Sequence, residues 1–233
     1  MGQIIITVKA LNWTCGNIGN VSVLLNGGSC RIDWGDGHVS SISVPPYSKK
    51  PEWYGASHAY PASCMAAEER FNIYVSSGDD DNIIGIDADS GEMDVDDVDI
   101  RGCQSIKHFS ASHLISHFDL TGNPGIETVY LRGEACLWAD FSNSVELREL
   151  IFNNTGGGLF DKVEKLDLSK CDKLEYLDCC YAWDLKDIVI SNRSALKEFV
   201  YNDKTPLSEK SLGIIRRIIE RNGGKITKEK TYF

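Results

Sequence analysis

Apolar residues recur through the second half of the chain in a short pattern, L-x-x-L-x-L, that occurs twice in every stretch of about 21 residues. Residues 163–180 (VEKLDLSKCDKLEYLDCC) contain both copies, which begin eleven residues apart. Five such pairs share this offset, and successive pairs begin 20, 21, 27 and 22 residues apart. A period of this size predicts a solenoid. The first copies begin at Val95, Ile115, Cys136, Val163 and Leu185, and the second copies at Ile106, Ile126, Leu147, Leu174 and Leu196.

The pattern also predicts the shape of one coil. The last two apolar positions of each copy alternate, so they face the same side of a short strand. Such a strand cannot bury that side alone, but coils stacked about 4.8 Å apart join their apolar sides into one core. Two copies per coil predict two strands on opposite sides of a flattened coil. The long step of 27 residues is explained by a surface loop at 153–160 (NNTGGGLF). The alternative is an ordinary sandwich with coincidental spacing.

Residues 3–88 read as short β-strands separated by turn residues. Asn26-Gly27-Gly28 and Gly35-Asp36-Gly37 each have the composition of a hairpin turn. Residues 44–57 (VPPYSKKPEWYGAS) read as a long loop. The predicted strands are IIITV, NVSVLLN, SCRIDW, HVSSISV, RFNIYVSS and NIIGI.

Residues 205–224 have the apolar spacing of one amphipathic helix. Ser208 is the expected N-cap, and Gly223-Gly224 is the expected end. Because the last coil of a solenoid needs a cover, we expect this helix to cap it. The apolar stripe consists of Leu212, Ile215, Ile218 and Ile219.

The turn that follows each first copy carries Cys103, Asn123 and Cys171 at equivalent positions. Residues 93–203 therefore resemble leucine-rich repeats of about 21 residues, which carry Asn or Cys there. The resemblance implies that these side chains satisfy backbone groups at the turn, coil after coil. Ser144 and Arg193 occupy the other two equivalent positions, so this ladder is incomplete. The fold itself hosts many binding roles.

The first part of the chain contains IDWGDG, then His58-Ala59-Tyr60, then FNIYVSSG. This series resembles the PKD domain, an immunoglobulin-like β-sandwich. The resemblance implies that Trp34 and Tyr60 are core residues and that Asp33 and Asp36 form turns. A PKD-like domain before leucine-rich repeats is similar to bacterial cell-surface repeat proteins, and it implies adhesion or protein binding at a cell surface or in secretion.

The expected fold class is therefore mainly β. An N-terminal PKD-like β-sandwich spans residues 1–88, a leucine-rich-repeat solenoid of about five coils spans residues 89–203, and a C-terminal helical cap spans residues 204–233.

The net charge of −10 comes from ten carboxylates between Asp79 and Asp99, a stretch without Lys or Arg. The remaining chain has 24 acidic and 24 basic residues, a balance that argues against a nucleic-acid partner. No run of eighteen apolar residues exists, so no membrane span is expected. The first residues show no signal peptide, and the compartment stays open.

The acidic stretch offers Asp87, Asp89, Glu92 and Asp94 as candidate calcium ligands. Their spacing does not match an EF-hand loop, and a solvated junction before the first coil is the alternative. No other cofactor is expected.

A zinc site is the second metal candidate, because His108, His113 and His117 lie near Asp119 in the sequence. In the repeat register these histidines fall on different strands and a turn.

The eight cysteines contain no C-x-x-C spacing, which removes the strongest zinc and redox signal. Cys15, Cys30 and Cys64 share the N-terminal part and allow one disulfide. Cys30 with His38 or His58 would be a nucleophilic pair, although WGDGH already has a structural explanation. The chain has no phosphate-binding glycine loop and no G-x-S-x-G. We therefore expect a protein that is not an enzyme, with a metal-dependent enzyme and a structural spacer as the alternatives.

The outward positions of the predicted strands differ between the two sides of the coil. On the first strands, Asp99, Asp119, Asp140 and Asp167 are followed by Val189, a near-uniform column that indicates a repeated structural role. On the second strands the column varies from coil to coil. It reads Ser110, Tyr130, Ile151, Asp178 and Val200, flanked by His108, Thr128, Glu149, Tyr176 and Glu198.

A contiguous set of aromatic and aliphatic groups in water is typical of a binding site. We expect Tyr130, Ile151 and Tyr176 to form the centre of contact with a protein or glycan partner, with Arg132 and Glu149 at its rim. The alternative is that the 154–160 loop or a neighbouring molecule covers these side chains. The sequence leaves the identity of the partner and the oligomeric state open.

Overall fold

The structure is a computed structural model, and it is mainly β, with one C-terminal helix and a β-solenoid of about four turns. The chain divides into two compact units, Met1–Ile115 and Ser116–Phe233. The structure describes residues 3–9, 17–44, 50–64, 69–77, 82–89, 93–112, 118–132, 139–153 and 163–230, without the side chains of Asp89 and Phe118.

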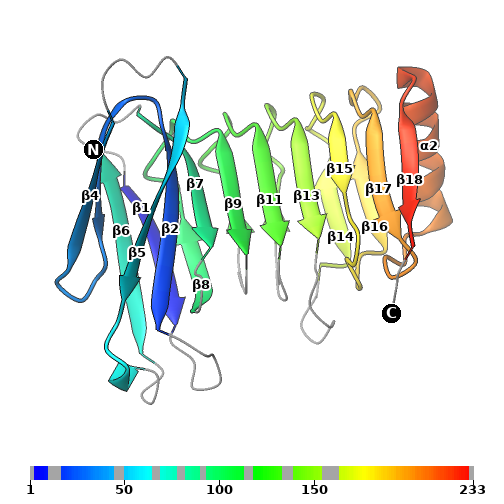
Figure 1. The fold of residues 1–233 in the computed structure, drawn as a ribbon. Coiled ribbons are helices and arrows are strands. Elements are labelled where there is room, and N and C mark those ends of the chain that lie inside the picture. Colours follow the sequence, from blue (N-terminus) through cyan, green and yellow to red (C-terminus); the bar gives the residue numbers. More distant parts are fainter. Residues whose placement is uncertain are drawn as a thin grey trace. The chain divides into compact units, whose positions relative to one another are not determined.

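The first unit contains one antiparallel five-stranded sheet. Along its strands alternate side chains are buried, as Ile4, Ile6 and Val8 show, because successive residues of a strand point to opposite faces. The order of the strands is β4 (Val39–Val44), β3 (Gly28–Asp33), β6 (Arg70–Ser77), β1 (Gln3–Lys9) and β8 (Asp94–Asp99) (Figure 1).

A second group of strands in this unit shares its interior with the first sheet. A Cβ atom on Gly19 would lie 3.2 Å from the ring of Tyr60 and 3.8 Å from Ile73 of β6. Trp34 and Tyr60 are each 1% exposed, so the expectation that they are core residues is confirmed. The group runs β5 (Glu52–Ala59), β2 (Ile18–Leu25), β7 (Ile83–Asp89) and β9 (His108–Ser112).

Two predictions about the connections of the first unit were wrong. Residues 52–59 form strand β5 instead of a loop, and they pair with β2 over eight residues. Because β5 lies at an edge and five of its eight residues are exposed, it lacks the apolar alternation that predicts a strand. Asn26-Gly27-Gly28 closes no hairpin, because β2 and β3 belong to different sheets; the positive φ angles of both glycines let the chain cross between them. Gly35-Asp36-Gly37 does close the β3–β4 hairpin.

The first predicted coil is not a complete turn of solenoid. Its first strand, β8, pairs antiparallel with β1 in the five-stranded sheet. Its second strand, β9, pairs in parallel with β7, with His108 opposite Gly85. Because β8 pairs antiparallel with β1, it does not join the parallel stack of coils. The structure therefore has about four turns of solenoid, whereas the pattern predicts five.

The second unit stacks the second strands of successive coils in parallel. Val129, Leu150, Leu177 and Phe199 are neighbours in register and are all fully buried. The predicted repeat register is therefore confirmed here. The strands run β11 (Thr128–Arg132), β13 (Glu149–Asn153), β15 (Tyr176–Asp178), β17 (Glu198–Asn202) and β18 (Lys225–Glu229) (Figure 1).

The first strands of the coils form two short parallel pairs. Asp119 lies opposite Asp140, and Asp167 lies opposite Val189, as the pattern predicts. Cys136 and the predicted loop at 154–160 lie outside the described residues. The pairs are β10 (Phe118–Asp119) with β12 (Ala139–Asp140), and β14 (Lys165–Leu168) with β16 (Asp187–Ile190).

The aspartate column closes the turns after the first strands. In each turn one carboxylate oxygen accepts a hydrogen bond from the backbone N–H two residues later. The distances are 2.9 Å at Asp99, 2.8 Å at Asp119, 2.7 Å at Asp140 and 3.1 Å at Asp167. The repeated structural role predicted for this column is confirmed.

In three of the turns, the next turn position carries a side chain that contacts a carbonyl oxygen from earlier in the chain. The Sγ atoms of Cys103 and Cys171 lie 3.8 and 3.9 Å from the carbonyl oxygens of Ile83 and Phe141. In the last coil Ser194 takes this place, and its hydroxyl donates to the Leu174 carbonyl at 3.2 Å.

Arg193 was predicted at this position, and that prediction was wrong. The last turn begins one residue late, at Ser191, so Ser194 is fully buried. Arg193 instead forms an ion pair with Asp172 at 2.8 Å.

The C-terminal helix, α2 (Glu209–Asn222), matches its prediction. Ser208 caps it by accepting from the Ser211 N–H, and the chain leaves at Gly223 with φ +66°. The last residue of the helix, Asn222, attaches it to the last coil, because its side-chain amide donates to the carbonyls of Ser194 and Leu196. No helix among the described residues has the length and apolarity needed to cross a membrane. The apolar stripe of α2 is buried, and it consists of Leu212, Ile215, Ile218 and Ile219.

Strand β18 was not predicted. It follows the helix and pairs in parallel with β17, with Lys225 opposite Glu198. Gly224 makes this return possible, because a side chain there would overlap the carbonyl oxygen of Lys197.

Candidate functional site

The candidate site lies on the outward side of β11, β13 and β15, which we call the strand face. All five residues predicted to contact a partner lie on it. Parallel pairing places Glu149 beside Tyr176, and Tyr130 beside Ile151. Arg132 ends β11 and is exposed. The predicted positions are therefore neighbours in space, although up to 46 residues separate them in the sequence.

Tyr130, Arg132 and Glu149 form one group. The Tyr130 phenol donates to Oε2 of Glu149 at 2.7 Å, and the Arg132 guanidinium lies 5.6 Å from the centre of the same ring. Burial raises the pKa of Tyr130 to about 12, and the hydrogen bond to Glu149 contributes in the same direction. The phenol is therefore protonated at neutral pH and is held in one position.

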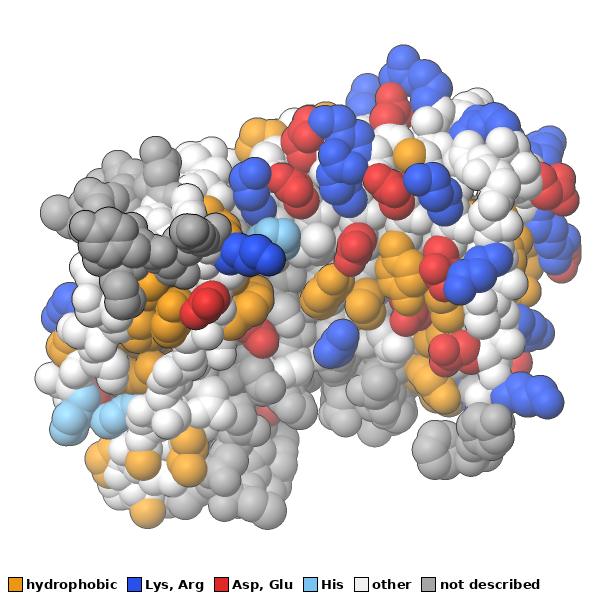
Figure 2. Space-filling view, turned by 45° about the horizontal axis from the view of Figure 1, so that its top comes forward, with side chains coloured by type: hydrophobic (Ala, Val, Ile, Leu, Met, Phe, Trp, Pro, Cys, Tyr) orange, Lys and Arg blue, Asp and Glu red, His pale blue; other side chains and the backbone are white. Residues whose placement is uncertain are grey.

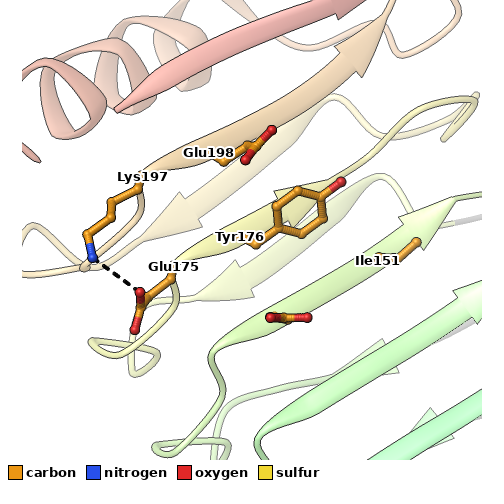
Figure 3. Close-up of a pocket in the computed structure, with 6 residues that line it drawn as sticks. Ile151, Glu175, Tyr176, Lys197 and Glu198 are labelled. Atoms are coloured by element: carbon orange, nitrogen blue, oxygen red, sulfur yellow. Dashed lines mark hydrogen bonds and ion pairs between the residues drawn. The ribbon is translucent and has the colours of Figure 1, made fainter. Parts of the chain in front are cut away.

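A shallow hollow lies beside this group, at Tyr176 (Figure 3). Figure 3 shows Tyr176 and Ile151 on neighbouring strands, with the Glu175–Lys197 ion pair at the edge. Burial raises the pKa of Tyr176 to about 12, so this phenol is also protonated at neutral pH. The side chains that line the hollow are Glu149, Ile151, Glu175, Tyr176, Lys197 and Glu198.

Sequence reasoning missed the charged residues immediately before the strands. Glu175 lies between two cations, 3.0 Å from Arg148 and 3.2 Å from Lys197. In register, the positions before the strands read Glu127, Arg148, Glu175 and Lys197, so their charges alternate from coil to coil. This alternation of charge could have identified these residues from the sequence. Figure 2 shows hydrophobic side chains of the molecule bordered by such acidic and basic side chains.

The strand face is narrower than predicted. Val200 was expected in water, but it is only 5% exposed. Cys180 follows β15 and reaches Glu229 on β18, with its Sγ 3.6 Å from a carboxylate oxygen. In the parallel register Glu229 lies opposite Asn202, two residues after Val200.

Two of the four candidate calcium ligands, Asp87 and Asp94, have described side chains. Asp87 lies on β7 and Asp94 begins β8, and these strands belong to different sheets. The side chain of Asp89 and all of Glu92 lie outside the described residues.

The zinc candidate is mostly outside the described residues as well. His108 is on β9, whereas His113 and His117 are not described. Among the cysteines with described positions, Cys30 and Cys64 are free thiols, and Cys15 is not described.

The nucleophilic pair of Cys30 with His38 or His58 has little support. Both histidines contact Asp36. Burial raises the pKa of the Cys30 thiol to about 12. At neutral pH the sulfur is therefore protonated, which makes it a poor nucleophile.

Comparisons of the chain with protein-family models, with curated proteins and with solved structures find no match.

Proposed function

We propose that this chain is a non-enzymatic binding protein that uses the strand face to hold a protein or glycan partner. The observation that carries the proposal is the hollow at Tyr176. There an aromatic ring and the aliphatic side chain of Ile151 face solvent, and the carboxylates of Glu149, Glu175 and Glu198 surround them. An apolar centre with a polar rim is the usual anatomy of a contact surface.

The rigidity of the scaffold supports binding over a purely structural spacer. The outward side chains stand on strands whose backbones are paired in register, so their positions are set before a partner arrives. Pre-organised side chains lose less conformational entropy on binding. A spacer gains nothing from leaving Tyr130 and Tyr176 partly exposed.

We also propose that residues 89–203 are leucine-rich repeats and that residues 1–88 are a PKD-like β-sandwich. In support of the first, Cys171 and Ser194 reach a carbonyl of the preceding coil, and Cys103 reaches the carbonyl of Ile83 on β7. In support of the second, the Tyr60 hydroxyl donates to the Trp34 carbonyl at 2.8 Å within a shared interior. This pairing of domains is similar to that of bacterial cell-surface proteins, which makes cell adhesion the proposed role.

Replacing Tyr130 and Tyr176 together by Ser tests the strand face. We expect binding partners found on glycan and protein arrays to be lost by this variant, while its melting temperature stays close to that of the wild-type chain. The matched control is Val189→Ser, because Val189 is exposed on the first strands, on β16. This control should keep the partners.

Repeating the array measurement in chelator separates the proposal from its metal-dependent alternative. Binding through the strand face needs no ion and should persist. Equal binding by the Ser variant and the wild-type chain, or a large loss of stability in that variant, would contradict the proposal.

A further inference from the structure

Three potential metal-binding side chains meet in the first unit, away from the strand face. Asp36 and His38 lie in the turn between β3 and β4, and His58 lies near the end of β5. One donor atom from each comes within 4.8 Å of the other two. Within the described residues this is the single group of at least three His, Cys, Asp or Glu side chains that meets such a criterion.

Asp36 stands at the centre of the group. Its Oδ2 lies 2.7 Å from Nε2 of His58, and its Oδ1 lies 3.2 Å from Nδ1 of His38. The centres of the two imidazole rings are 4.8 Å apart. Two imidazoles therefore contact one carboxylate, His38 from the β3–β4 turn and His58 from strand β5.

Packing holds His58 in place. Its ring stacks on Trp34 at 5.4 Å and meets the edge of Tyr60 at 4.7 Å. The Trp34 indole donates in turn to Ser40 at 2.9 Å. The His58 side chain is only 14% exposed, so its rotamer is set by these neighbours and its nitrogen stays aimed at Asp36.

The turn holds Asp36 equally well. Oδ1 accepts from the His38 backbone N–H at 3.0 Å. Gly35 takes φ +82°, and a side chain there would lie 2.5 Å from the Asn72 carbonyl oxygen, so the turn packs tightly against β6. Asp36 is therefore positioned by the backbone and not by the histidines alone.

The third donor remains adjustable. The His38 side chain is 72% exposed, and it can turn about its χ angles without disturbing the interior. The donor atoms of a tetrahedral zinc ion lie about 3.3 Å apart, which follows from metal–ligand distances of about 2.0–2.1 Å. The contacts of 2.7 and 3.2 Å are made by different oxygens of Asp36, and one donor atom from each of the three side chains lies within 4.8 Å of the other two. Rotation of the exposed His38 side chain can bring the three donors toward that spacing.

The donor set indicates the class of ion. Calcium prefers six or more oxygen ligands, which this group does not supply. Imidazole nitrogen with one carboxylate suits zinc and its first-row neighbours. Three protein donors leave one tetrahedral position, which the exposed side of the group opens to water.

We propose that Asp36, His38 and His58 bind a Zn²⁺ ion that links the β3–β4 turn to β5. The two elements belong to different sheets of the first unit. The bound ion is a cross-link that resists their separation. This site is independent of the strand face, so neither proposal depends on the other.

The experiment titrates the metal-free 233-residue chain with ZnCl₂ in a calorimeter and with Co²⁺ in a spectrophotometer. We expect one equivalent to bind, with the visible absorption of four-coordinate cobalt. Binding of an ion to the folded chain also raises the melting temperature with metal concentration. Calcium should produce neither effect.

His38→Ala is the main variant, because the exposure of His38 allows the fold to persist. Loss of an outer-shell partner alone typically costs about 10–100-fold in metal affinity, so loss of a ligand should cost at least as much. Asp36→Asn should weaken zinc binding in the same way. His108→Ala is the control, because His108 lies on β9 outside the group.

Three outcomes would overturn the proposal. The first is no one-equivalent binding by the wild-type chain, which would leave Asp36 as a purely structural partner of the histidines. The second is equal affinity in folded His38→Ala and wild-type chains. The third is loss of binding in His108→Ala, which would place the ion elsewhere.

Discussion

The Tyr130 hydroxyl donates to the Glu149 carboxylate across two neighbouring parallel strands, 2.7 Å away. The two residues are 19 positions apart in the sequence, and only the stacking of one coil on the next brings them together. Glu149 also lines the hollow beside Tyr176. The Glu149 carboxylate therefore connects Tyr130 on β11 with the hollow at Tyr176 on β15.

The first prediction concerns the ionisation of Tyr130. Burial and the bond to Glu149 raise its pKa to about 12 from an ordinary value of 10.0. Glu149→Gln removes the negative charge but keeps the size of the side chain, so the pKa should fall part of the way back. Titration of chains with ¹³C-labelled tyrosine, followed by NMR, measures this. An unchanged Tyr130 pKa in the variant would show that burial alone sets it.

The second prediction tests the core of the solenoid. Leu177 is fully buried between Leu150 and Phe199. Leu177→Ala should lower the free energy of unfolding by about 2–5 kcal/mol, because it leaves a cavity. The control, Val189→Thr, alters an exposed β-branched residue and should change it by less than about 0.5 kcal/mol. Urea unfolding measures both, and equal small effects would contradict the register.

The third prediction concerns pH. Side-chain and backbone hydrogen bonds from Ser169 lower the pKa of Asp167 below its ordinary value of 3.8. A lowered folded pKa contributes stability that is present above pH 3.8 and is lost as the pH falls through the folded value. Asp167→Asn still accepts the backbone bond but cannot titrate. Urea midpoints compared between pH 7 and pH 3 should therefore fall less in the variant; an identical fall would rule out this contribution.

The fourth prediction compares two glycines near the C-terminus. Gly224→Ala should destabilise the chain strongly, because its Cβ would overlap the Lys197 carbonyl oxygen and push β18 from β17. Gly213 lies inside α2 with open space around it. Gly213→Ala should instead stabilise by about 0.5–1 kcal/mol, since alanine favours the helix. The melting temperature should fall in Gly224→Ala and rise in Gly213→Ala. Equal changes in the two variants would contradict the role given to Gly224 in the pairing of β18 with β17.

The period of the apolar pattern predicted the solenoid because every coil buries side chains at the same positions of its repeat. Leu150 and Leu177 are equivalent in sequence and adjacent in space for that reason. The aspartate turns were predictable on the same ground. Strand β8 shows the limit, because it carries the repeat pattern but pairs antiparallel with β1. A pattern identifies which side chains are buried, but it does not identify the partner that buries them.

Other features were not predicted because the contacts that produce them join residues that are far apart in the sequence. Strand β5 has no apolar alternation, and its pairing with β2 comes from backbone hydrogen bonds that any sequence can make. The strand face was located from its outward column, but the charges at Glu175 and Lys197 required the register. Asp36 and His58 were each visible in a motif, yet the 2.7 Å contact between them depends on how two sheets meet.

Strand β18 has a consequence for how copies of this chain behave at high concentration. A parallel stack grows by adding any strand of suitable register, including one from another molecule, and β18 is the outermost strand of its sheet among those described. It reads KITKE, with exposed Lys225, Lys228 and Glu229. Charged side chains, lysine above all, discourage strand addition at a sheet edge. The charges on β18 therefore disfavour the addition of a strand from a second molecule at this edge.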